Sequence, residues 1–413
     1  MKKIKLYLNG MRSRCFVLFA CLAIMASLAS CSEDYFENNI PEEQKQFSKA
    51  ELIEQALSRM PQTRAGHVVV AMVTTKKEVL LELYIDTLHG ININWGDDTN
   101  TEVTSAHDKY SHTYTDGKPS HGIYLEGSYE ALHWLWLTKN ELIYLNIASN
   151  TELDIVNCSD NKLDNIDVDY CPKLATFWAP RNELSFIDLR NMPNLVGLLL
   201  QNNSALKTLD VSKNSKLQIL YIGGTAIKDI DLSNNINLQS LYLSGLALST
   251  INNLPLSDTS FSIFPKLRDL YVDGTPFSSL DLSKNPAITG LSIAFTSITQ
   301  LDISNLNIDW IVATSSNLTD LIYTKNNLLN SYEFHLDGTP FESNTAGMFR
   351  FITALPDRSD KTSGILFCYS DAVNTFASLL ERNNWKVNTY YTTRGVENFD
   401  DLYEHERLYS LAH

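Results

Sequence analysis

Three consecutive segments decide the fold: LATFWAPRNELSFIDLRNMPN (174–194), LVGLLLQNNSALKTLDVSKNSK (195–216) and LQILYIGGTAIKDIDLSNNIN (217–237). Each begins with leucine at position 0, has apolar residues at positions +3 and +5, and has Asn or Thr at +8. An apolar–Asp–apolar triplet follows near position +14. Self-similarity at such a period is the signature of a solenoid, in which stacked coils bury one another's apolar faces.

The same pattern extends in both directions from these segments. Successive units are 20 to 22 residues apart, except for one interval of 29 residues, and they begin at Leu132, Leu153, Leu174, Leu195, Leu217, Leu238, Leu267, Ile288 and Ile308. The start of each unit places alternate apolar side chains on one side of a short strand. The Asn or Thr at +8 can satisfy backbone groups of the neighbouring coil, and the triplet returns along the opposite wall.

No unit has room for a long helix, so we predict a mostly β fold with short helices. Its main part is a solenoid of about nine coils of ~21 residues over residues 131–330, with a parallel sheet on its concave face. The pattern resembles the short leucine-rich repeats of the internalin type, and the convex segments VSKN (211–214) and LSKNP (282–286) carry the likeness. It also resembles surface proteins of gut Bacteroidetes. The resemblance implies adhesion or ligand binding by the concave or lateral surface, without a defined ligand.

Position +4 lies between two buried positions, so its side chain faces out of the sheet. Five of the nine residues there are aromatic: Trp136, Trp178, Tyr221, Tyr242 and Tyr271. We interpret them as a candidate ligand-binding stripe, because aromatic rings suit sugar faces or a protein epitope. Arg181 and Asp273 are flanking hydrogen-bonding candidates. The alternative is that stacked aromatic side chains only stabilise the sheet.

The 29-residue unit carries its excess in NNLPLSDTSFSIFP (252–265), which predicts a loop projecting from one rim. Such a loop either binds a partner or is a tolerated insertion. Cys158, Cys171 and Cys368 have neither the spacing of a metal site nor that of a disulfide framework, so we predict small core residues. Pairing of Cys158 with Cys171 remains open.

Residues 1–30 have the layout of a secretory signal: basic residues, then an apolar run from Cys15 to Leu28, then small residues. The sequence LASC (28–31) resembles a bacterial lipobox, which implies that Cys31 is lipidated and anchors the chain to a membrane. Glu33 and Asp34 resemble the surface-export signal of Bacteroidetes lipoproteins. We therefore expect a lipid-anchored outer-membrane protein that faces the exterior. Residues 31–65 are predicted to form an acidic tether, with a capping box at Ser48 that predicts a helix over 49–60.

Residues 66–130 are predicted to form a small β-sandwich. HVVVAMVTT (67–75) and EVLLELYI (78–85) are strand-like and indicate a hairpin that turns at Lys76 and Lys77. WGDDT (95–99) and the later HTY (112–114) resemble the hallmarks of a PKD-type domain, with Asp98 in place of its second glycine. The Asp and His residues of this region match no metal-ligand spacing, so we interpret them as structural and predict no metal or cofactor.

After residue 330 the repeat fades, and residues 331–413 are predicted to form an α/β cap over the last coil. The pattern predicts helices over 345–355 and 372–383, the second capped by Asp371, and strands over 364–368 and 385–391. The segment LPDRSDKTSGIL (355–366) resembles a recurrent ending of Bacteroidetes repeat proteins.

Charge and motifs limit the function. The formal charge is −15, and removal of the five basic signal residues makes it −20, which argues against nucleic acid and anionic lipid as partners. The sequence contains no GxSxG, HExxH, phosphate-loop or Rossmann motif, so we predict a monomeric, non-catalytic protein. Three functions remain open: an adhesin that binds an extracellular protein, a surface glycan-binding protein for nutrient capture, and a structural envelope protein.

Overall fold

The computed structural model describes residues 47–58, 67–86, 88, 90–252, 254–255, 261–369, 373 and 375–388. The predicted signal segment and Cys31 lie outside the described residues. The chain divides into two compact units between Glu51 and Leu52. The repeats belong to the second unit, and the description below concerns that unit, apart from the start of the first helix.

The first helix, α2, spans Lys49–Leu57 and crosses this boundary. The predicted capping box is confirmed, because the Ser48 amide donates to the Glu51 carboxylate at 2.8 Å and Ser48 Oγ accepts from the Glu51 amide at 3.3 Å. The second half of the helix packs Ala56 against Val73 and Ile143. No helix of the described residues is long and apolar enough to cross a membrane.

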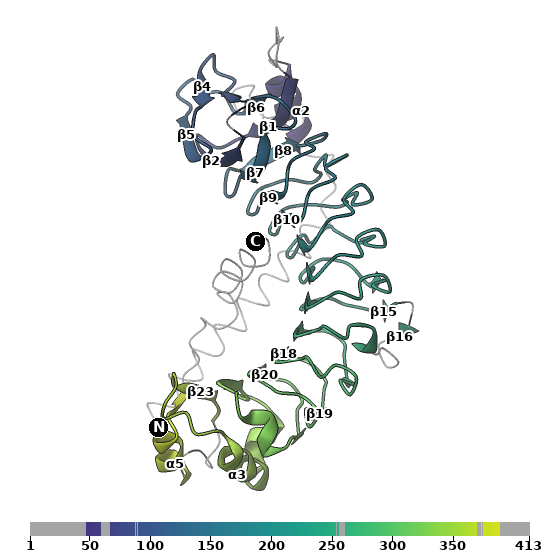
Figure 1. The fold of residues 1–413 in the computed structure, drawn as a ribbon, viewed down its shortest axis with the longest axis vertical. Helices are drawn as coiled ribbons and strands as arrows, with labels where there is room; N and C mark the ends of the chain where they lie inside the picture. The colour runs from purple at the N-terminus through teal and green to yellow at the C-terminus, as the bar shows by residue number, and fades with distance from the viewer. Residues whose placement is uncertain are drawn as a thin grey trace, which may run out of the picture. The chain divides into compact units, whose positions relative to one another are not determined.

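One 14-stranded sheet runs through the repeats, and every predicted unit contributes one strand to it (Figure 1). Neighbouring strands from β7 to β24 pair in parallel, one coil to the next. The repeat strands are β7 (Leu132–Trp136), β9 (Ile155–Asn157), β10 (Thr176–Trp178), β11 (Gly197–Leu199), β12 (Ile219–Tyr221), β14 (Ser240–Tyr242), β17 (Asp269–Tyr271), β18 (Gly290–Ser292) and β20 (Trp310–Val312).

The side chains at +3 point into the coils and form the core of the stack. All of them are fully buried, and they line up from coil to coil as Leu135, Val156, Phe177, Leu198, Leu220, Leu241, Leu270, Leu291 and Ile311. Because one coil is too thin to enclose these residues, the parallel pairing of neighbouring coils is what removes them from water.

The asparagine side chains at +8 form hydrogen bonds between neighbouring coils. The Asn182 amide donates to Cys158 O at 2.9 Å in the preceding coil and to Ala179 O at 3.2 Å in its own. Its Oδ1 accepts from the Leu163 amide at 3.1 Å. In later coils a threonine takes this position, and its hydroxyl donates to a carbonyl of the same coil, as Thr296 does to Ile293 O. The predicted contact with the neighbouring coil is therefore confirmed for Asn and wrong for Thr, whose shorter side chain bonds a carbonyl of its own coil.

The residue at +7 has a positive φ in every repeat. Glycine occupies it at Gly224, Gly245 and Gly274. Elsewhere the left-handed conformation is adopted by non-glycine residues: Lys139, Asp160, Arg181, Asn202, Phe295 and Ser315. This turn directs the chain from the sheet across the coil to its opposite wall.

The opposite wall holds a second column of buried asparagines. Asn214 donates to Leu189 O and Met192 O of the preceding coil, and Asn235 and Asn285 make equivalent bonds. Cys171 takes the same place, and its thiol donates to Ile147 O at 3.2 Å. Short strands form locally on this wall: β13 (Asp229–Ile230), β15 (Thr250–Ile251), β16 (Leu254–Pro255), β19 (Gln300–Asp302) and β21 (Asp320–Ile322).

The predicted insertion is partly core. Phe261 and Phe264 are buried, around the short helix η4 (Phe261–Ile263), and β16 pairs antiparallel with β15. The prediction of a purely projecting loop is wrong for this part, because two aromatic side chains fill the coil interior. Cys158, Cys171 and Cys368 are buried, as predicted, and Cys158 and Cys171 do not pair with one another. Burial raises the pKa of the Cys171 thiol to about 12.

The N-terminal strands are divided between two sheets. A five-stranded sheet has the order β4-β3-β6-β1-β8, whereas β5 and β2 extend the long sheet beyond β7. Strands of both sheets contribute to one hydrophobic cluster that includes Trp95 and the repeat core. The strands are β1 (His67–Thr74), β2 (Glu78–Ile85), β3 (Ile91–Asn94), β4 (Asn100–Val103), β5 (His107–Thr113), β6 (His121–Gly127) and β8 (Leu142–Asn146).

The predicted hairpin between β1 and β2 is wrong. β1 pairs with β6 and β8, and β2 pairs with β5 and β7, so the turn at Lys76 crosses from one sheet to the other. Thr74 Oγ1 fixes this crossing by donating to Asn140 O at 2.6 Å and accepting from the Lys76 amide at 2.9 Å. The unbroken apolar run of β1 reflects burial on both faces, which is typical of a central strand.

β1 and β2 occupy the place of a coil before the first repeat. Asn140, the first +8 asparagine, accepts from the Leu80 amide at 2.9 Å and donates to Leu80 O at 2.7 Å, both in β2. Asn150, the first asparagine of the second column, donates to Val69 O of β1 at 2.6 Å. The two strands thus cover the first coil on both of its walls.

The long sheet continues through the region predicted as a cap. The predicted secondary structure is found there: α3 (Thr345–Ala354), β23 (Gly364–Phe367), α5 (Ala377–Arg382) and β24 (Trp385–Asn388), preceded by β22 (Glu333–His335) and the short helices η5 (Lys325–Leu328) and η6 (Pro340–Ser343). Asn344 caps α3 by accepting from the Gly347 amide. Asp371 and the end of the predicted final strand lie outside the described residues.

Candidate ligand-binding face

The aromatic side chains at +4 form a contiguous row. Tyr221, Tyr242 and Tyr271 are in direct register across β12, β14 and β17. The ring centroids of Tyr221 and Tyr242 are 5.5 Å apart, and those of Tyr242 and Tyr271 are 5.3 Å apart, with tilted planes. The predicted adjacency of these three tyrosines is confirmed, and its cause is the parallel register that the buried +3 residues impose.

A second aromatic group lies at the N-terminal end of the row. Trp136 and Trp178 meet edge to face at 5.8 Å, although Asn157 separates them in the sheet. Trp178 is only 8 % exposed and Leu199 only 1 %, and both pack with Ile219, Trp136 and Tyr221. This outward face therefore has a hydrophobic cluster of its own, and Trp178 is more deeply packed than an outward position predicts.

Trp310 is an aromatic residue that the +4 pattern misses. It stands at +2 in β20, yet its ring lies 5.3 Å from that of Tyr271. Gly290, its partner in β18, leaves the space for it, because a Cβ there would lie 2.3 Å from the indole ring. The sequence signal for this contact is an aromatic residue at +2 paired with a glycine at +2 of the preceding repeat.

Arg181 lies at the turn beside the sheet, at the left-handed position +7. Its guanidinium forms a two-point pair with the Asp160 carboxylate of the preceding coil, at 2.5 Å and 2.9 Å. The two residues present a neutral pair at one rim of the aromatic row.

The Asp273 carboxylate accepts hydrogen bonds from both neighbouring coils. It accepts from Ser244 Oγ at 2.8 Å, from the Ala294 amide at 2.7 Å and from Ser292 Oγ. Burial raises the pKa of this carboxyl, and the bonds from Ser292 and Ser244 oppose the shift. These contacts give Asp273 a structural role, whether or not it also contacts a ligand.

The WGDDT turn near the N-terminus is held by packing and hydrogen bonds. Asp97 accepts from Thr99 and lies 2.8 Å from His112 Nε2, and the His112 ring stacks on Trp95. Burial would raise the pKa of Asp97, but the bonds from Thr99 and His112 outweigh it and lower the pKa. Asp98 has a φ of 70°, the conformation that suits the glycine it replaces. Within the described residues no cluster of three His, Cys, Asp or Glu could hold a metal.

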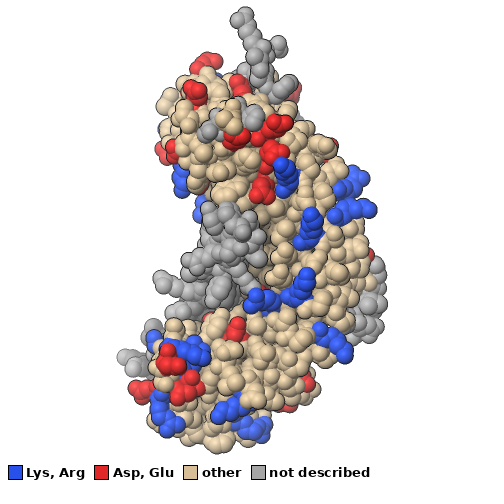
Figure 2. Space-filling model, in the orientation of Figure 1, with Lys and Arg blue, Asp and Glu red and all other residues tan. Residues whose placement is uncertain are grey.

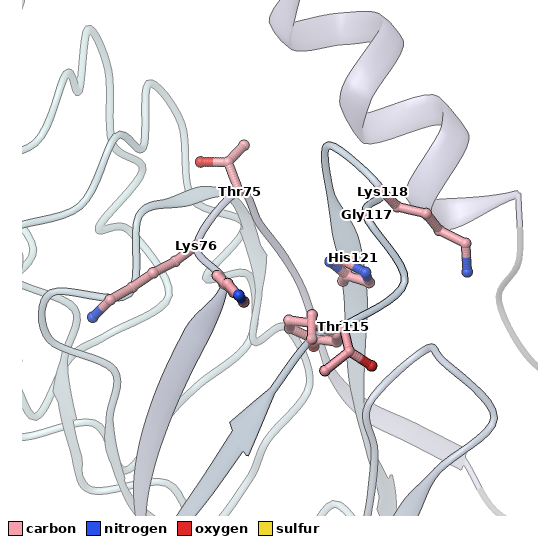
Figure 3. A pocket seen from close by; sticks show the side chains of 8 residues that line it. Thr75, Lys76, Thr115, Gly117, Lys118 and His121 are labelled. Atoms are coloured by element: carbon pink, nitrogen blue, oxygen red, sulfur yellow. The ribbon is translucent and has the colours of Figure 1, made fainter.

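A polar pocket lies between the β1–β2 crossing and the β5–β6 loop (Figure 3). Three lysines line it, but Figure 3 shows the Lys76 and Lys118 side chains pointing away from one another. Lys118 pairs with Asp116 at 2.6 Å, and Lys76 donates to Lys139 O. The charges of Lys76 and Lys118 therefore do not converge in the pocket. Figure 2 likewise shows Lys and Arg side chains scattered along the repeats on the face in view.

The parallel sheet, the buried +3 column and the asparagine ladder define a leucine-rich-repeat solenoid with an aromatic sheet face. No family model and no curated protein matches the sequence. Similar solved structures include the functional domain of InlJ from Listeria monocytogenes, at 18 % identity over 57 % of this chain and 60 % of that domain, with a TM-score of 0.41. An internalin from the same organism, InlF, has 15 % identity over 62 % of this chain and 86 % of its own, with a TM-score of 0.38. YopM from Yersinia enterocolitica has 23 % identity over 49 % and 46 %, with a TM-score of 0.36. At these values the function must be argued from the residues of this chain.

Proposed function

We propose that this chain is a non-catalytic binding module of the bacterial cell surface, which binds an extracellular protein through the sheet face of its repeats. The observation that carries the proposal is the contiguous row from Trp136 and Trp178 to Tyr221, Tyr242 and Tyr271, with Trp310 beyond it. Aromatic residues supply large contact area and dominate the binding energy of many protein interfaces. The rigid stack of coils presents the row without a loop that must be ordered on binding.

The proposal includes the anchor. A lipidated Cys31 at the outer membrane would place the module outside the cell, and the acidic residues after Cys31 favour the exterior side. Digestion of intact cells with an added protease tests this side: loss of the protein supports the exterior, and full protection contradicts it.

A second candidate function is binding of a glycan for nutrient capture. The tilted tyrosine rings favour it, because aromatic faces suit the C–H surfaces of sugars. Tyr221 OH already lies 3.0 Å from Ser240 Oγ at the same face.

A triple variant tests the row: Trp178→Ala, Tyr221→Ala and Tyr242→Ala together. The full chain and the variant are compared by titration calorimetry against captured surface proteins and by glycan-array binding. Loss of a protein ligand supports the first function, and loss of a glycan supports the second. Because Trp178 is packed, thermal unfolding and the double variant Tyr221→Ala/Tyr242→Ala accompany it. Tyr170→Ala/Phe186→Ala, which removes two exposed aromatic residues elsewhere, is the matched control. Retention of every ligand by a folded triple variant contradicts the site.

A further inference from the structure

Six outward-facing side chains form a regular grid at the N-terminal end of the long sheet. Side chains alternate along a strand, and Leu81 and Leu83 of β2 are buried. Glu82 and Tyr84 therefore point to the opposite face of the sheet. In the register of the antiparallel pairs, Tyr84 faces His107 on β5 and Trp134 on β7. Glu82 faces Lys109 and Trp136 on the same two strands. The grid thus has a first row of His107, Tyr84 and Trp134 and a second row of Lys109, Glu82 and Trp136.

The first row is an aromatic platform. The rings of Tyr84 and Trp134 lie 5.0 Å apart with an interplanar angle of 32°, so they partly stack on one another and leave the outer side of the pair for a ligand. His107 and His133 stand more steeply against Tyr84, at 55° and 63°. Tyr84 is 38 % exposed and the His107 side chain 51 %. The platform is therefore open to solvent at the Tyr84–His107 end.

The second row supplies hydrogen-bonding groups beside this platform. The Glu82 carboxylate lies 2.9 Å from His107 Nε2 and 3.3 Å from Lys109 Nζ. The opposite charges of Glu82 and Lys109 cancel, so the grid is close to neutral on a chain whose formal charge is −15. Two residues along a strand span about 7 Å, so the polar row is about one sugar ring away from the aromatic row.

We propose that this grid, the N-terminal sheet patch, binds the pyranose rings of a neutral glycan. The C–H face of a sugar packs on the exposed part of the Tyr84 ring, beside Trp134. Its hydroxyls then reach the Glu82 carboxylate, the Lys109 ammonium and the His107 ring, which together accept and donate. Neutrality favours an uncharged ligand, because an acidic or basic polymer would find no excess of opposite charge to offset its desolvation. The patch shares only Trp136 with the repeat row, and the sugar contacts proposed for it are made by residues outside that row. The inference therefore goes beyond the proposed function and does not depend on the repeats' ligand.

A purely structural role makes a different prediction. Cross-strand aromatic pairs stabilise a sheet, and charged residues on an edge strand such as β5 prevent unwanted pairing. Under that role, substitution at Tyr84 lowers the unfolding temperature and leaves ligand binding unchanged.

The full chain is titrated by calorimetry with a panel of neutral hexasaccharides: cello-, xylo-, manno-, malto- and laminarihexaose. We expect at least one to bind, Tyr84→Ala to weaken that binding at least tenfold, and Glu82→Gln to weaken it less. Tyr84→Leu, which keeps an apolar side chain without the ring, separates loss of stacking from loss of folding and should also lose binding. Tyr170→Ala, at another exposed tyrosine, is the control and should bind like the wild type.

Several results would overturn the patch. One is the absence of binding to all five hexasaccharides, and another is unchanged binding in folded Tyr84→Ala and Tyr84→Leu. Tighter binding of polygalacturonate than of every neutral chain would overturn its neutral character, and so would a protein partner as the ligand that Tyr84→Ala loses. A hexasaccharide lost in Tyr242→Ala but kept in Tyr84→Ala would assign glycan binding to the repeat row instead. The two sites fail separately, because the triple variant of the repeats leaves Tyr84, Glu82 and His107 intact.

Discussion

At the scale of single residues, the +8 asparagine accounts for the regularity of the early coils. An asparagine amide has two donors and an acceptor, so it can bond two coils at once, as Asn182 does. A threonine hydroxyl reaches its own coil, as at Thr296. The position is buried in both cases, so the difference in hydrogen bonds becomes a difference in stability.

We expect Asn182→Ala to cost about 2–3 kcal/mol of unfolding free energy, because it leaves the buried Leu163 amide without its acceptor. Cys158 O and Ala179 O keep the hydrogen bonds from the side chains of Asn161 and Asn203. Thr296→Ala, at the equivalent position, should cost about 1 kcal/mol. Urea denaturation followed by circular dichroism measures both. Equal costs at the two sites would refute the role of Asn182 in joining coils.

Asp273 should make stability depend on pH. Burial raises its folded pKa above the usual value, so the folded state binds the proton more tightly than the unfolded chain does. Its contribution is therefore complete below about pH 3.9 and is lost as the pH rises through the folded pKa. Asp273→Asn removes this loss while keeping an acceptor for the Ala294 amide. The variant should gain stability relative to wild type at pH 7 and little at pH 3.5, measured by urea denaturation at both values. A larger relative gain at pH 3.5 would show the opposite sign.

At the scale of elements, the turn after each strand has one position, +7, that requires a left-handed backbone conformation. The +7 residue is left-handed in every repeat, and where it is not glycine the side chain crowds its own backbone. Phe295 is the bulkiest residue there, and it is 54 % exposed, so it gains little from packing.

Phe295→Gly should therefore keep or raise the unfolding free energy, by up to about 1 kcal/mol, against the usual loss for a glycine substitution. Its backbone bond to Thr314 O needs no side chain. Ser297→Gly, two residues later and without a positive φ, is the control and should destabilise. Thermal unfolding compares the two, and a clear loss at Phe295 would mean that its ring packs on the turn.

The sequence predicted the repeat elements because their period is set by a local rule, the burial of +3 and +5. It predicted the strand segments β1 and β2 as well, but paired them wrongly. Pairing of two adjacent strands is decided by what covers each of them. Here Asn140 and Asn150 hold β2 and β1 on opposite walls of the first coil, and neither bond has a local sequence signal. Trp310 was missed for a similar reason, since the space beside Gly290 belongs to another coil.

At the scale of the whole second unit, the long sheet joins the N-terminal strands, the repeats and the C-terminal strands by hydrogen bonds from β5 to β24. Each coil contacts its neighbours, so an end that loses its cover exposes a full layer of core. The predicted row of aromatic side chains was correct in its order, because register follows from the buried residues. The low exposure of Trp178 was not predictable, because it depends on the size of the neighbouring side chains.

A chain that begins at residue 130 should therefore fold poorly. It exposes the first coil on both walls and leaves the Asn140 and Asn150 side chains without β2 and β1. We expect aggregation or a fall in unfolding temperature of at least 10 °C, since a solenoid requires a cover at its terminus. Size-exclusion chromatography and calorimetry measure these, with a chain lacking residues 1–46 as the control. A stable monomer from residue 130 would contradict the covering role of β1 and β2.

The contacts of α2 determine which sheet receives a force applied to the N-terminal part of the chain. The second half of this helix packs on Val73 and Ile143 and accepts hydrogen bonds from Ser120 Oγ at Leu52 O and from Tyr124 OH at Ala56 O. These partners belong to β1, β8, β6 and the loop before β6, and not to the sheet with the aromatic row. Tension applied to the chain ahead of α2 therefore enters through the five-stranded sheet. Under the anchoring proposed above, the load on a tethered molecule would enter through this sheet and not through the strands that carry the proposed binding row.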